Sequence, residues 1–458
     1  MTEERYGILM KGDVMNYWEE YKSKLCTAEE AVRLVKSGDW VDYGSNNGYP
    51  VTLDTALAAR KEELHSVKVR GNLLRGPIQV VECDPLMEHF VYDSWHCSGY
   101  ERKLCDVGRA FFTPMLFRDL DRYYHQYLTV DVAMLSVAPM DEHGNFNLSG
   151  ALGAERGIVD VAKKIIVEVN ENLPRIRGGA EVSIPLSRVD AIVEAGKLQL
   201  WEMKSPEPSE IDRQIASHVL PLIPDGAVIQ LGIGGMPNAL GELLAESDLK
   251  DLGMHTELCS DGYLALYKSG KLTNAQKTLH PGKGVLGLAI GSQELFDWIN
   301  DNDGILGAPL SYVNNPWVIA QNEKMISING CLNVDLYGQV ASESAGTRQI
   351  SGTGGQLDFV TGASMSKGGQ AFLCLPSTFT DKKGVLHSRI LPQLAGDIVT
   401  TPRAQAPTIV TEYGAVNLTG RSTWERTERL ISIAHPDFRE ELIRKAEDQR
   451  IWLPSNKR

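Results

Sequence analysis

The chain has 458 residues, of which 43% are hydrophobic and 23% are charged, and its formal net charge is −13. This length exceeds what one hydrophobic core usually organises, so we expect two domains. The acidic balance argues against a nucleic-acid partner, and no apolar run approaches the length of a membrane span.

The cysteines predict free thiols in a reducing compartment. They are odd in number, scattered and without a Cys-x-x-Cys pair: Cys26, Cys83, Cys97, Cys105, Cys259, Cys331 and Cys374. This spacing favours neither a disulfide framework nor a zinc site. The N-terminal residues lack the charged-then-apolar order of a signal peptide. We therefore expect a cytoplasmic protein that holds no metal.

Two segments, one in each half of the chain, share a single pattern. Residues 38–50 and 226–237 each run from a glycine through a short strand pattern to a second glycine and then a proline. A Leu/Ala-rich helical pattern follows each segment, at 53–59 and 240–245. The order predicts a strand, a tight turn and a helix start, where free N–H groups and the helix dipole favour an anion.

A second pair of segments recurs at a similar offset. Residues 141–150 match residues 335–344, and each segment is followed by a helical stretch and an apolar strand, at 164–169 and 370–375. Two such matches indicate that one unit is duplicated. Short apolar runs that alternate with amphipathic helices predict parallel strands buried on both faces. We therefore expect an α/β protein of two tandem open domains with mainly parallel sheets.

The segment 201–210 is polar and breaks both periodicities, so it predicts the boundary between the two domains. We place an N-terminal α/β domain at 1–205 and a C-terminal α/β domain, carrying the site, at 206–458. In open parallel sheets, ligands bind at the carboxyl ends of the strands. A site between the two sheets is therefore the expected arrangement.

The C-terminal copy carries the residues that point to chemistry. Its turn at 232–237 reads Gly-x-Gly-x-x-Pro, which is not the dinucleotide fingerprint and by itself also fits a turn that binds nothing. Glu257 follows at the expected end of the next strand. The loop 351–359 has closely spaced glycines, which are costly except where a ligand approaches the backbone, although a surface loop is the alternative. A glycine-lined anion site beside a carboxylate suggests chemistry on an acyl group or a phosphate.

Seven segments, read in order, carry a resemblance to a known family. They are 232–237, 255–257, 312–316, 338–344, 351–359, 411–414 and 434–438. Together they resemble class I CoA-transferases, in the acetyl-CoA hydrolase/transferase branch that includes the 4-hydroxybutyrate and butyryl-CoA:acetate enzymes. Segments 94–103 and 167–174 resemble the butyryl-CoA:acetate members in particular, so the resemblance covers nearly the whole chain.

The resemblance implies a ping-pong reaction. A glutamate attacks the acyl-CoA thioester to give an acyl-glutamyl anhydride, the released thiolate returns to form a glutamyl-CoA thioester, and a carboxylate such as acetate reverses the sequence. By motif position the nucleophile is Glu257. Glu343 is the rival, but in the family that position can be Asp, which a nucleophile of fixed reach would not tolerate. The N–H groups near Gly234 and Gly235, or those of the 352–355 loop, are expected to stabilise the oxyanion.

The resemblance also implies supporting residues. Asn314 is expected to orient the nucleophile, with an Asx turn before Pro316 as the alternative. Glu412 is interpreted as structural, and Lys367, Lys382 and Lys383 are candidates for the CoA phosphates, although loop lysines are usually only solvated. The residues expected to contact CoA are Gly232, Ile233, Gly234, Gly235, Met236, Leu332 and Gly355.

The leading hypothesis is transfer of CoA from a short-chain acyl-CoA, with butyryl or propionyl favoured, to acetate. An acyl-CoA hydrolase on the same scaffold is the second hypothesis, and it differs in needing no carboxylate acceptor. A non-catalytic CoA-binding sensor is disfavoured because a sensor needs no nucleophile. We expect no cofactor, since CoA is a substrate, no membrane or nucleic-acid partner, and a homo-oligomer.

Overall fold

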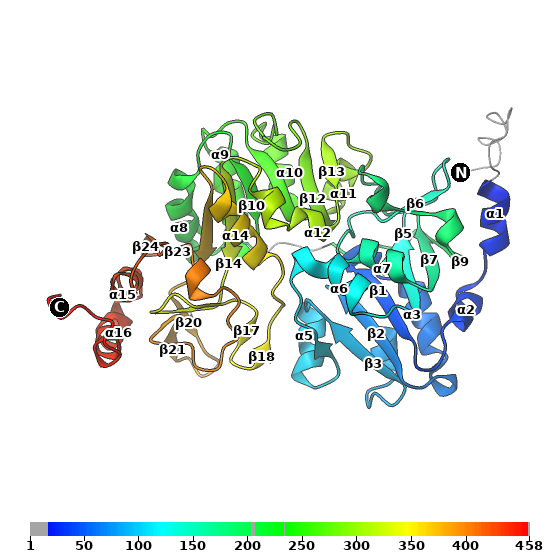
Figure 1. Cartoon of the computed structure of the whole chain (residues 1–458), viewed down its shortest axis with the longest axis horizontal. Helices are drawn as coiled ribbons and strands as arrows, with labels where there is room; N and C mark the ends of the chain where they lie inside the picture. The colour runs from blue at the N-terminus through cyan, green and yellow to red at the C-terminus, as the bar shows by residue number, and fades with distance from the viewer. Residues whose placement is uncertain (1–16, 203–206, 233, 457–458) are drawn as a thin grey trace.

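The computed structural model describes residues 17–202, 207–232 and 234–456 (Figure 1). Two large sheets dominate it, one in each half of the chain. The N-terminal half (17–202) and the C-terminal half (207–456) lie side by side, coloured blue to green and green to red. The expected boundary at 205/206 falls among residues 203–206, which are outside the described residues, so that boundary stays a prediction.

The N-terminal half contains a seven-stranded sheet of order β4-β3-β2-β1-β5-β7-β9, in which every pair is parallel. Its strands are β1 (Trp40–Ser45), β2 (Val67–Asn72), β3 (Phe90–Ser94), β4 (Phe111–Phe112), β5 (Val132–Val137), β7 (Lys164–Asn170) and β9 (Ala191–Gly196). A small antiparallel pair joins β6 (Asn145–Asn147) to β8 (Ser183–Pro185). The helices are α1 (Tyr17–Lys24), α2 (Ala28–Ala31), α3 (Val51–Ala58), α4 (Gln79–Glu82), α5 (Gly99–Asp106), α6 (Leu120–Gln126) and α7 (Glu155–Val161).

The C-terminal half contains an eight-stranded sheet of order β13-β12-β11-β10-β14-β19-β23-β24, in which only the last pair is antiparallel. Its strands are β10 (Val228–Leu231), β11 (Gly253–Cys259), β12 (Gly284–Ala289), β13 (Ile305–Gly307), β14 (Met325–Gly330), β19 (Gln370–Cys374), β23 (Thr408–Thr411) and β24 (Gly414–Asn417). The helices are α8 (Glu210–Val219), α9 (Gly235–Glu246), α10 (Asp261–Lys268), α11 (Gln293–Ile299), α12 (Leu310–Val313), α13 (Pro316–Ile319), α14 (Gln356–Met365), α15 (Thr423–Ser432) and α16 (Pro436–Asp448).

Short strands complete the C-terminal half. One small sheet joins β16 (Val340–Ala341), β15 (Asn333–Asp335) and β22 (Ile390–Leu391), and two hairpins pair β17 (Ser344–Ala345) with β18 (Arg348–Gln349) and β20 (Thr378–Thr380) with β21 (Leu386–Ser388). Among the residues described, no helix is both long and apolar enough to cross a membrane.

The predicted α/β fold and its duplication are confirmed by the order of the strands. In each sheet the first strand of the half is flanked by the second and the fifth, and the third and fourth lie beyond the second. The matched segments also form the same turn: Gly144 N–H donates to the carbonyl of Asp141 (3.1 Å), and Gly338 N–H donates to that of Asp335 (2.8 Å). The central strands are buried along their whole length, as in β5 and β12, because helices cover both faces.

The topology places a crevice at the carboxyl end of β10. This strand pairs with β11 on one side and β14 on the other, so the strand order reverses at β10. Open α/β sheets bind ligands at such a topological switch point. The N-terminal half closes this edge. Its residues just before α5 meet the loop before α14, where Cys97 N–H donates to the carbonyl of Ser351 (3.3 Å).

Candidate active site

A cavity of about 220 Å³ opens at the carboxyl ends of β10, β11 and β14. Glu257, near the end of β11, lies in its wall together with Gly232 and the glycine loop at 351–356. The N-terminal half contributes Leu73 and His96 to the lining of the same cavity. The cavity is therefore built by both halves, as the sequence predicts, and it encloses the carboxylate that the sequence singles out.

Glu257 is held by two neutral hydrogen bonds. The amide nitrogen of Asn314 donates to its Oε2 at 2.7 Å, and the backbone of Gly355 donates to the same carboxylate. Burial is the largest influence on this group and raises its pKa to about 7, with the nearby Asp358 acting in the same direction and the two hydrogen bonds in the opposite one. The result is a carboxylate that is more basic, and so more nucleophilic, than one in water.

Asn314 belongs to a buried chain of polar groups behind the nucleophile. It follows α12 and is fully buried, and its amide also lies 3.4 Å from Oδ2 of Asp358. Asp358, also fully buried, pairs with Arg118 of the N-terminal half at 2.7 Å. The Asx turn that the sequence left open belongs to the next residue, since the side chain of Asn315 accepts the N–H of Trp317 (3.0 Å). The Asn314 side chain is thereby free to contact Glu257.

The glycine loop is compact because Glu257 lies against it. A Cβ at Gly355 would overlap both the carboxylate of Glu257 and the amide of Asn314. Gly354 has a φ of +55°, in the left-handed region that favours glycine. Both residues are buried, so the surface-loop alternative is wrong. Gly355 also caps α14, whose positive end therefore points at the cavity.

The rival Glu343 supports this loop instead of lining the cavity. Its carboxylate accepts the hydroxyls of Thr400 (3.0 Å) and Thr353 (3.2 Å), and its main-chain carbonyl accepts the N–H of Ile350 (2.8 Å). With both oxygens bound, Glu343 holds the strand that leads into the glycine loop. Cys259, two residues after Glu257, is fully buried and does not line the cavity. Burial raises the pKa of its thiol.

The other residues expected at the CoA site lie at varied distances from the cavity. Ile233 is outside the described residues. Gly234, with a φ of +122°, caps α9, and Gly235 opens that helix beside Asp212. Met236 is buried in the core. Leu332 is half-buried, and its carbonyl accepts Nη1 of Arg389 (2.9 Å). Among the described members of this set, Gly232 and Gly355 line the cavity with Glu257.

Glu412 and the three lysines considered for the CoA phosphates do not line the cavity. Glu412 accepts the N–H of Ser377 (2.9 Å), which fits its structural interpretation. Lys367 pairs with Glu323 at 3.1 Å on the surface. Lys382 and Lys383 lie at the exposed tip between β20 and β21.

Sequence reasoning missed His96, which lines the same cavity as Glu257 and comes from the N-terminal half. Burial, and then the positive charge of Arg102, lowers its pKa to about 4, so its imidazole is neutral at pH 7. Its Nδ1 has no hydrogen-bond partner among the residues described. The only signal in the sequence was its place inside the 94–103 segment that carries the family resemblance.

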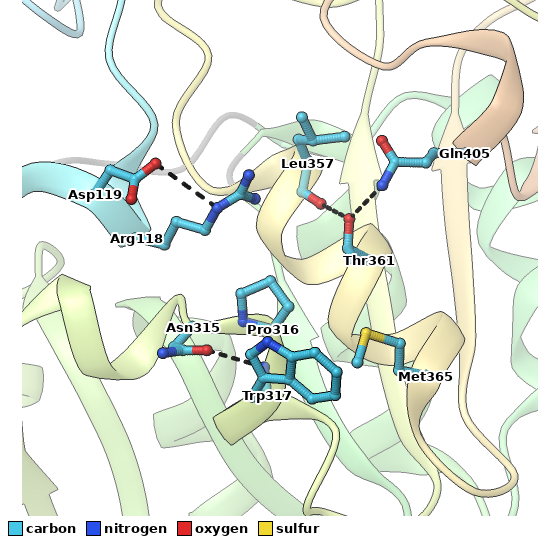
Figure 2. Close-up of a pocket in the computed structure, with 9 residues that line it drawn as sticks. All are labelled: Arg118, Asp119, Asn315, Pro316, Trp317, Leu357, Thr361, Met365 and Gln405. Atoms are coloured by element: carbon cyan, nitrogen blue, oxygen red, sulfur yellow. Dashed lines mark hydrogen bonds and ion pairs between the residues drawn. The ribbon is translucent and has the colours of Figure 1, made fainter.

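A second hollow, of about 400 Å³, lies beside a stripe of α14 (Figure 2). Leu357, Thr361 and Met365 form one wall, and the exposed ring of Trp317 forms another. None of the residues predicted for the site lines it. Its link to the cavity is Arg118, which lines the hollow and ion-pairs with Asp358. Glu257 and the glycine loop line the smaller cavity instead.

Comparisons with known proteins point to one family. The family model described as the acetyl-CoA hydrolase/transferase N-terminal domain matches residues 10–199, and that of the C-terminal domain matches residues 291–446. The chain is 48% identical to a butyryl-CoA:acetate CoA-transferase of Anaerostipes caccae, over 97% of this chain and 100% of the relative. It is 39% identical to a 4-hydroxybutyrate coenzyme A transferase of Clostridium kluyveri, over 93% and 98%.

Solved structures give the same result. RipA from Yersinia pestis superposes with a TM-score of 0.87 and 37% identity, covering 95% of this chain and 100% of RipA. A 4-hydroxybutyrate CoA-transferase from Porphyromonas gingivalis superposes with a TM-score of 0.80 and 32% identity, covering 95% and 100%. The chain therefore belongs to the acetyl-CoA hydrolase/transferase family.

Proposed function

We propose that this enzyme transfers CoA from a short-chain acyl-CoA, with butyryl or propionyl favoured, to acetate through a thioester between Glu257 and CoA. The observation that carries the proposal is the Glu257 carboxylate, fixed by Asn314 inside a cavity that a glycine loop and both halves of the chain enclose. The butyryl-CoA:acetate CoA-transferase named above supports the choice of substrates.

The first step is attack on the thioester carbonyl. Asn314 occupies Oε2 of Glu257, which leaves Oε1 as the attacking oxygen. The C–S bond breaks, CoA leaves as a thiolate, and an acyl-glutamyl anhydride remains. The thiolate then attacks the glutamyl carbonyl, the acyl carboxylate leaves, and Glu257 holds CoA as a thioester. Acetate repeats these steps in reverse. Holding the carboxylate against the thioester supplies the effective concentration that a free carboxylate lacks.

Each attack places negative charge on a carbonyl oxygen inside the cavity. The N-terminal end of α14 lies there, and its free N–H groups and helix dipole favour such a charge. The neutral imidazole of His96 lines the same cavity and has one nitrogen without a partner among the described residues, so His96 is the candidate for a second donor. A neutral donor suits this place because it stabilises an oxyanion without pairing permanently with Glu257.

Hydrolysis is the competing activity, and an acetyl-CoA hydrolase of Yarrowia lipolytica is 27% identical over 69% of this chain. The enclosure of Glu257 by the two halves favours transfer, because water must be kept from the glutamyl thioester. The test is a panel of acyl-CoA donors, each incubated with and without acetate. Loss of acyl-CoA that requires acetate supports transfer. Free CoA released at the same rate without acetate would establish a hydrolase.

We further propose that the reaction takes place in the cytoplasm. The seven cysteines, all within the described part of the chain, are free thiols, which is typical of a reducing compartment. The homo-oligomer stays a prediction, and light scattering on the purified protein tests it.

A further inference from the structure

Two thiols lie together at the border between the halves, outside the catalytic cavity. The Sγ atoms of Cys97 and Cys105 are 3.8 Å apart. They lie at the two ends of α5: Cys97 directly precedes the capping residue Ser98, and Cys105 lies in the last turn of the helix. A capping box between Ser98 and Glu101 fixes the start of this helix. The two sulfurs are therefore held at a distance from which one small movement bonds them.

The two thiols differ in access. Cys105 is half-buried and lines a hollow of about 440 Å³, which it shares with Phe111 of the N-terminal half and Arg348 of the C-terminal half. Cys97 is 3% exposed and lies behind it. The hydrogen bond between the two thiols lowers the pKa of Cys105 and raises that of Cys97. Cys105 is thus the more accessible thiol and has more thiolate character. Cys97 is placed to form a disulfide with Cys105 once Cys105 is oxidised.

The buried thiol adjoins the catalytic cavity. Cys97 follows His96 in the chain, and its N–H donates to the carbonyl of Ser351 (3.3 Å). Both His96 and Ser351 line the cavity with Glu257. From the same helix, Nε of Arg102 donates to the carbonyl of Ile350 (2.6 Å). Figure 1 shows α5 at this border, next to the hairpin of β17 and β18. A shift of Cys97 therefore moves the His96 wall relative to the glycine loop.

We propose that Cys97 and Cys105 are an oxidation site for hydrogen peroxide or a small organic hydroperoxide, and that their disulfide lowers the activity of the neighbouring site. The Cys105 thiolate attacks the O–O bond and becomes a sulfenic acid, while the departing oxygen takes up a proton. The Cys97 sulfur then attacks the Cys105 sulfur, the S–S bond forms, and hydroxide leaves with the Cys97 proton as water. Two thiols lose two electrons and hydrogen peroxide becomes two waters. A dithiol reverses the change.

Bond formation requires the sulfurs to close from 3.8 Å to about 2.05 Å. Cys105 is fixed within a helix, whereas Cys97 lies in the loop before it, so most of the movement falls on Cys97. Because His96 and the contact to Ser351 are part of that loop, the movement reaches the cavity. A displacement of this size beside reacting atoms is expected to cost up to about a hundredfold in rate.

The test oxidises the fully reduced enzyme with hydrogen peroxide, removes the peroxide with catalase, and divides the sample. Peptide mass spectrometry should find Cys97 linked to Cys105. Acyl-CoA:acetate transfer should fall by about tenfold or more and return with dithiothreitol. The mass measurement stands alone, whereas the rate measurement rests on the proposed function. No linked peptide, or a linked peptide with unchanged rate in an enzyme that transfers CoA, would overturn the proposal.

Three variants make the test specific. Cys105→Ser should keep the basal rate and resist peroxide, because Cys105 does not line the catalytic cavity. Cys83→Ser is the matched control: Cys83 is also half-buried but ends α4, so this variant should respond like the parent. In Cys97→Ser the chemistry should stop at the sulfenic acid, which dimedone traps at Cys105. Inactivation of Cys105→Ser equal to that of the parent would contradict the proposal, as would a dimedone label found elsewhere.

Discussion

The two halves contain the same crevice, but each fills it differently. In the N-terminal half, Glu155 at the start of α7 turns into the βα turn after β1 and accepts the N–H of Ser45 (2.7 Å) and its hydroxyl. At the equivalent start of α14, Gln356 donates to Thr401 (3.0 Å) instead. The turn after β1 is thus filled by the carboxylate of Glu155, whereas Gly232 after β10 lines the cavity.

The strand beside that turn differs in the same sense. Val41 of β1 and Ile229 of β10 occupy equivalent positions in the duplicated segments, and they pair with Val69 and Met254 on the next strand. Glu257 lies three residues after Met254. The residue three after Val69 is Asn72, which therefore occupies the position equivalent to Glu257. The residues that cap α7 and α14 have nearly the same backbone angles, −103° and 0° for Ala154 and −95° and 6° for Gly355. One half therefore has Asn and Ala where the other has Glu and Gly. The duplication supplies the scaffold, and these exchanges create the site.

The sharpest way to break this comparison is to remove the nucleophile. Glu257→Gln keeps the volume but cannot form the anhydride, so transfer should fall by about a thousandfold or more. Steady-state rates with butyryl-CoA and acetate measure the effect, and circular dichroism checks the fold. Glu343→Gln is the companion variant, and it should retain far more activity because Glu343 supports the loop. A dead Glu343→Gln enzyme beside an active Glu257→Gln enzyme would reverse the assignment.

The glycine before α14 offers a matched exchange between the halves. Gly355→Ala places a methyl group where the Glu257 carboxylate lies, so kcat/KM should fall by about a hundredfold. The mirror change, Ala154→Gly, alters the same position in the half without the nucleophile. It should leave kcat/KM within about twofold and cost only a small amount of stability. Equal losses from the two changes would show that the halves share the chemistry.

Asn314 and Asp358 act in opposite directions on the pKa of Glu257, so removing each should shift the pH profile of transfer in the opposite sense. Transfer needs the ionised carboxylate, so the rate of the parent should fall as the pH drops through about 7. Asn314→Ala removes a hydrogen bond that lowers the pKa, so the acid limb should move to higher pH by about one unit. Asp358→Asn removes a charge that raises it, so the limb should move to lower pH. Profiles of kcat/KM from pH 5 to about 9 separate the two, and shifts in one direction would refute this electrostatic account.

The smallest expected effect concerns the carboxylate that fills the N-terminal crevice. Burial raises the pKa of Glu155 to about 7, so between its ordinary value and 7 the folded state binds more protons than the unfolded state. The contribution of Glu155 to stability is therefore lost as the pH rises through that window. Glu155→Gln should raise Tm relative to the parent more at pH 8 than at pH 5 while leaving transfer nearly unchanged. A difference in Tm that does not depend on pH would contradict this.

The sequence predicted those features that depend on local pattern. The strand that ends near Glu257 and the duplication follow from periodicity and spacing, and the structure has both. The predicted strand and helix on either side of the glycine turn are also present, as β10 and α9. Glu343 and Glu257 could not be separated by local pattern alone, because each lies in a motif that carries the same family resemblance. Their difference lies in contacts with residues such as Thr353 and Asn314, which only the fold brings together.

His96 could not be predicted, because its role depends on the docking of one half against the other. It precedes α5 in the N-terminal half, and the resemblance of segment 94–103 to the family assigns it no role. The same holds for Arg118, which reaches Asp358 across 240 residues of chain. Contacts between the halves carry no periodicity, so they escape any argument from local spacing.

The most direct measurement traps CoA on Glu257. The enzyme is incubated with butyryl-CoA and no acetate, then treated with borohydride, which reduces thioesters but not carboxylates. The account predicts irreversible inactivation that requires butyryl-CoA, a reduced Glu257 in the peptide spanning 255–259, and the same behaviour in Cys259→Ser, whose thiol is buried in the parent. Inactivation lost in Cys259→Ser, or a modification on any residue other than Glu257, would contradict it.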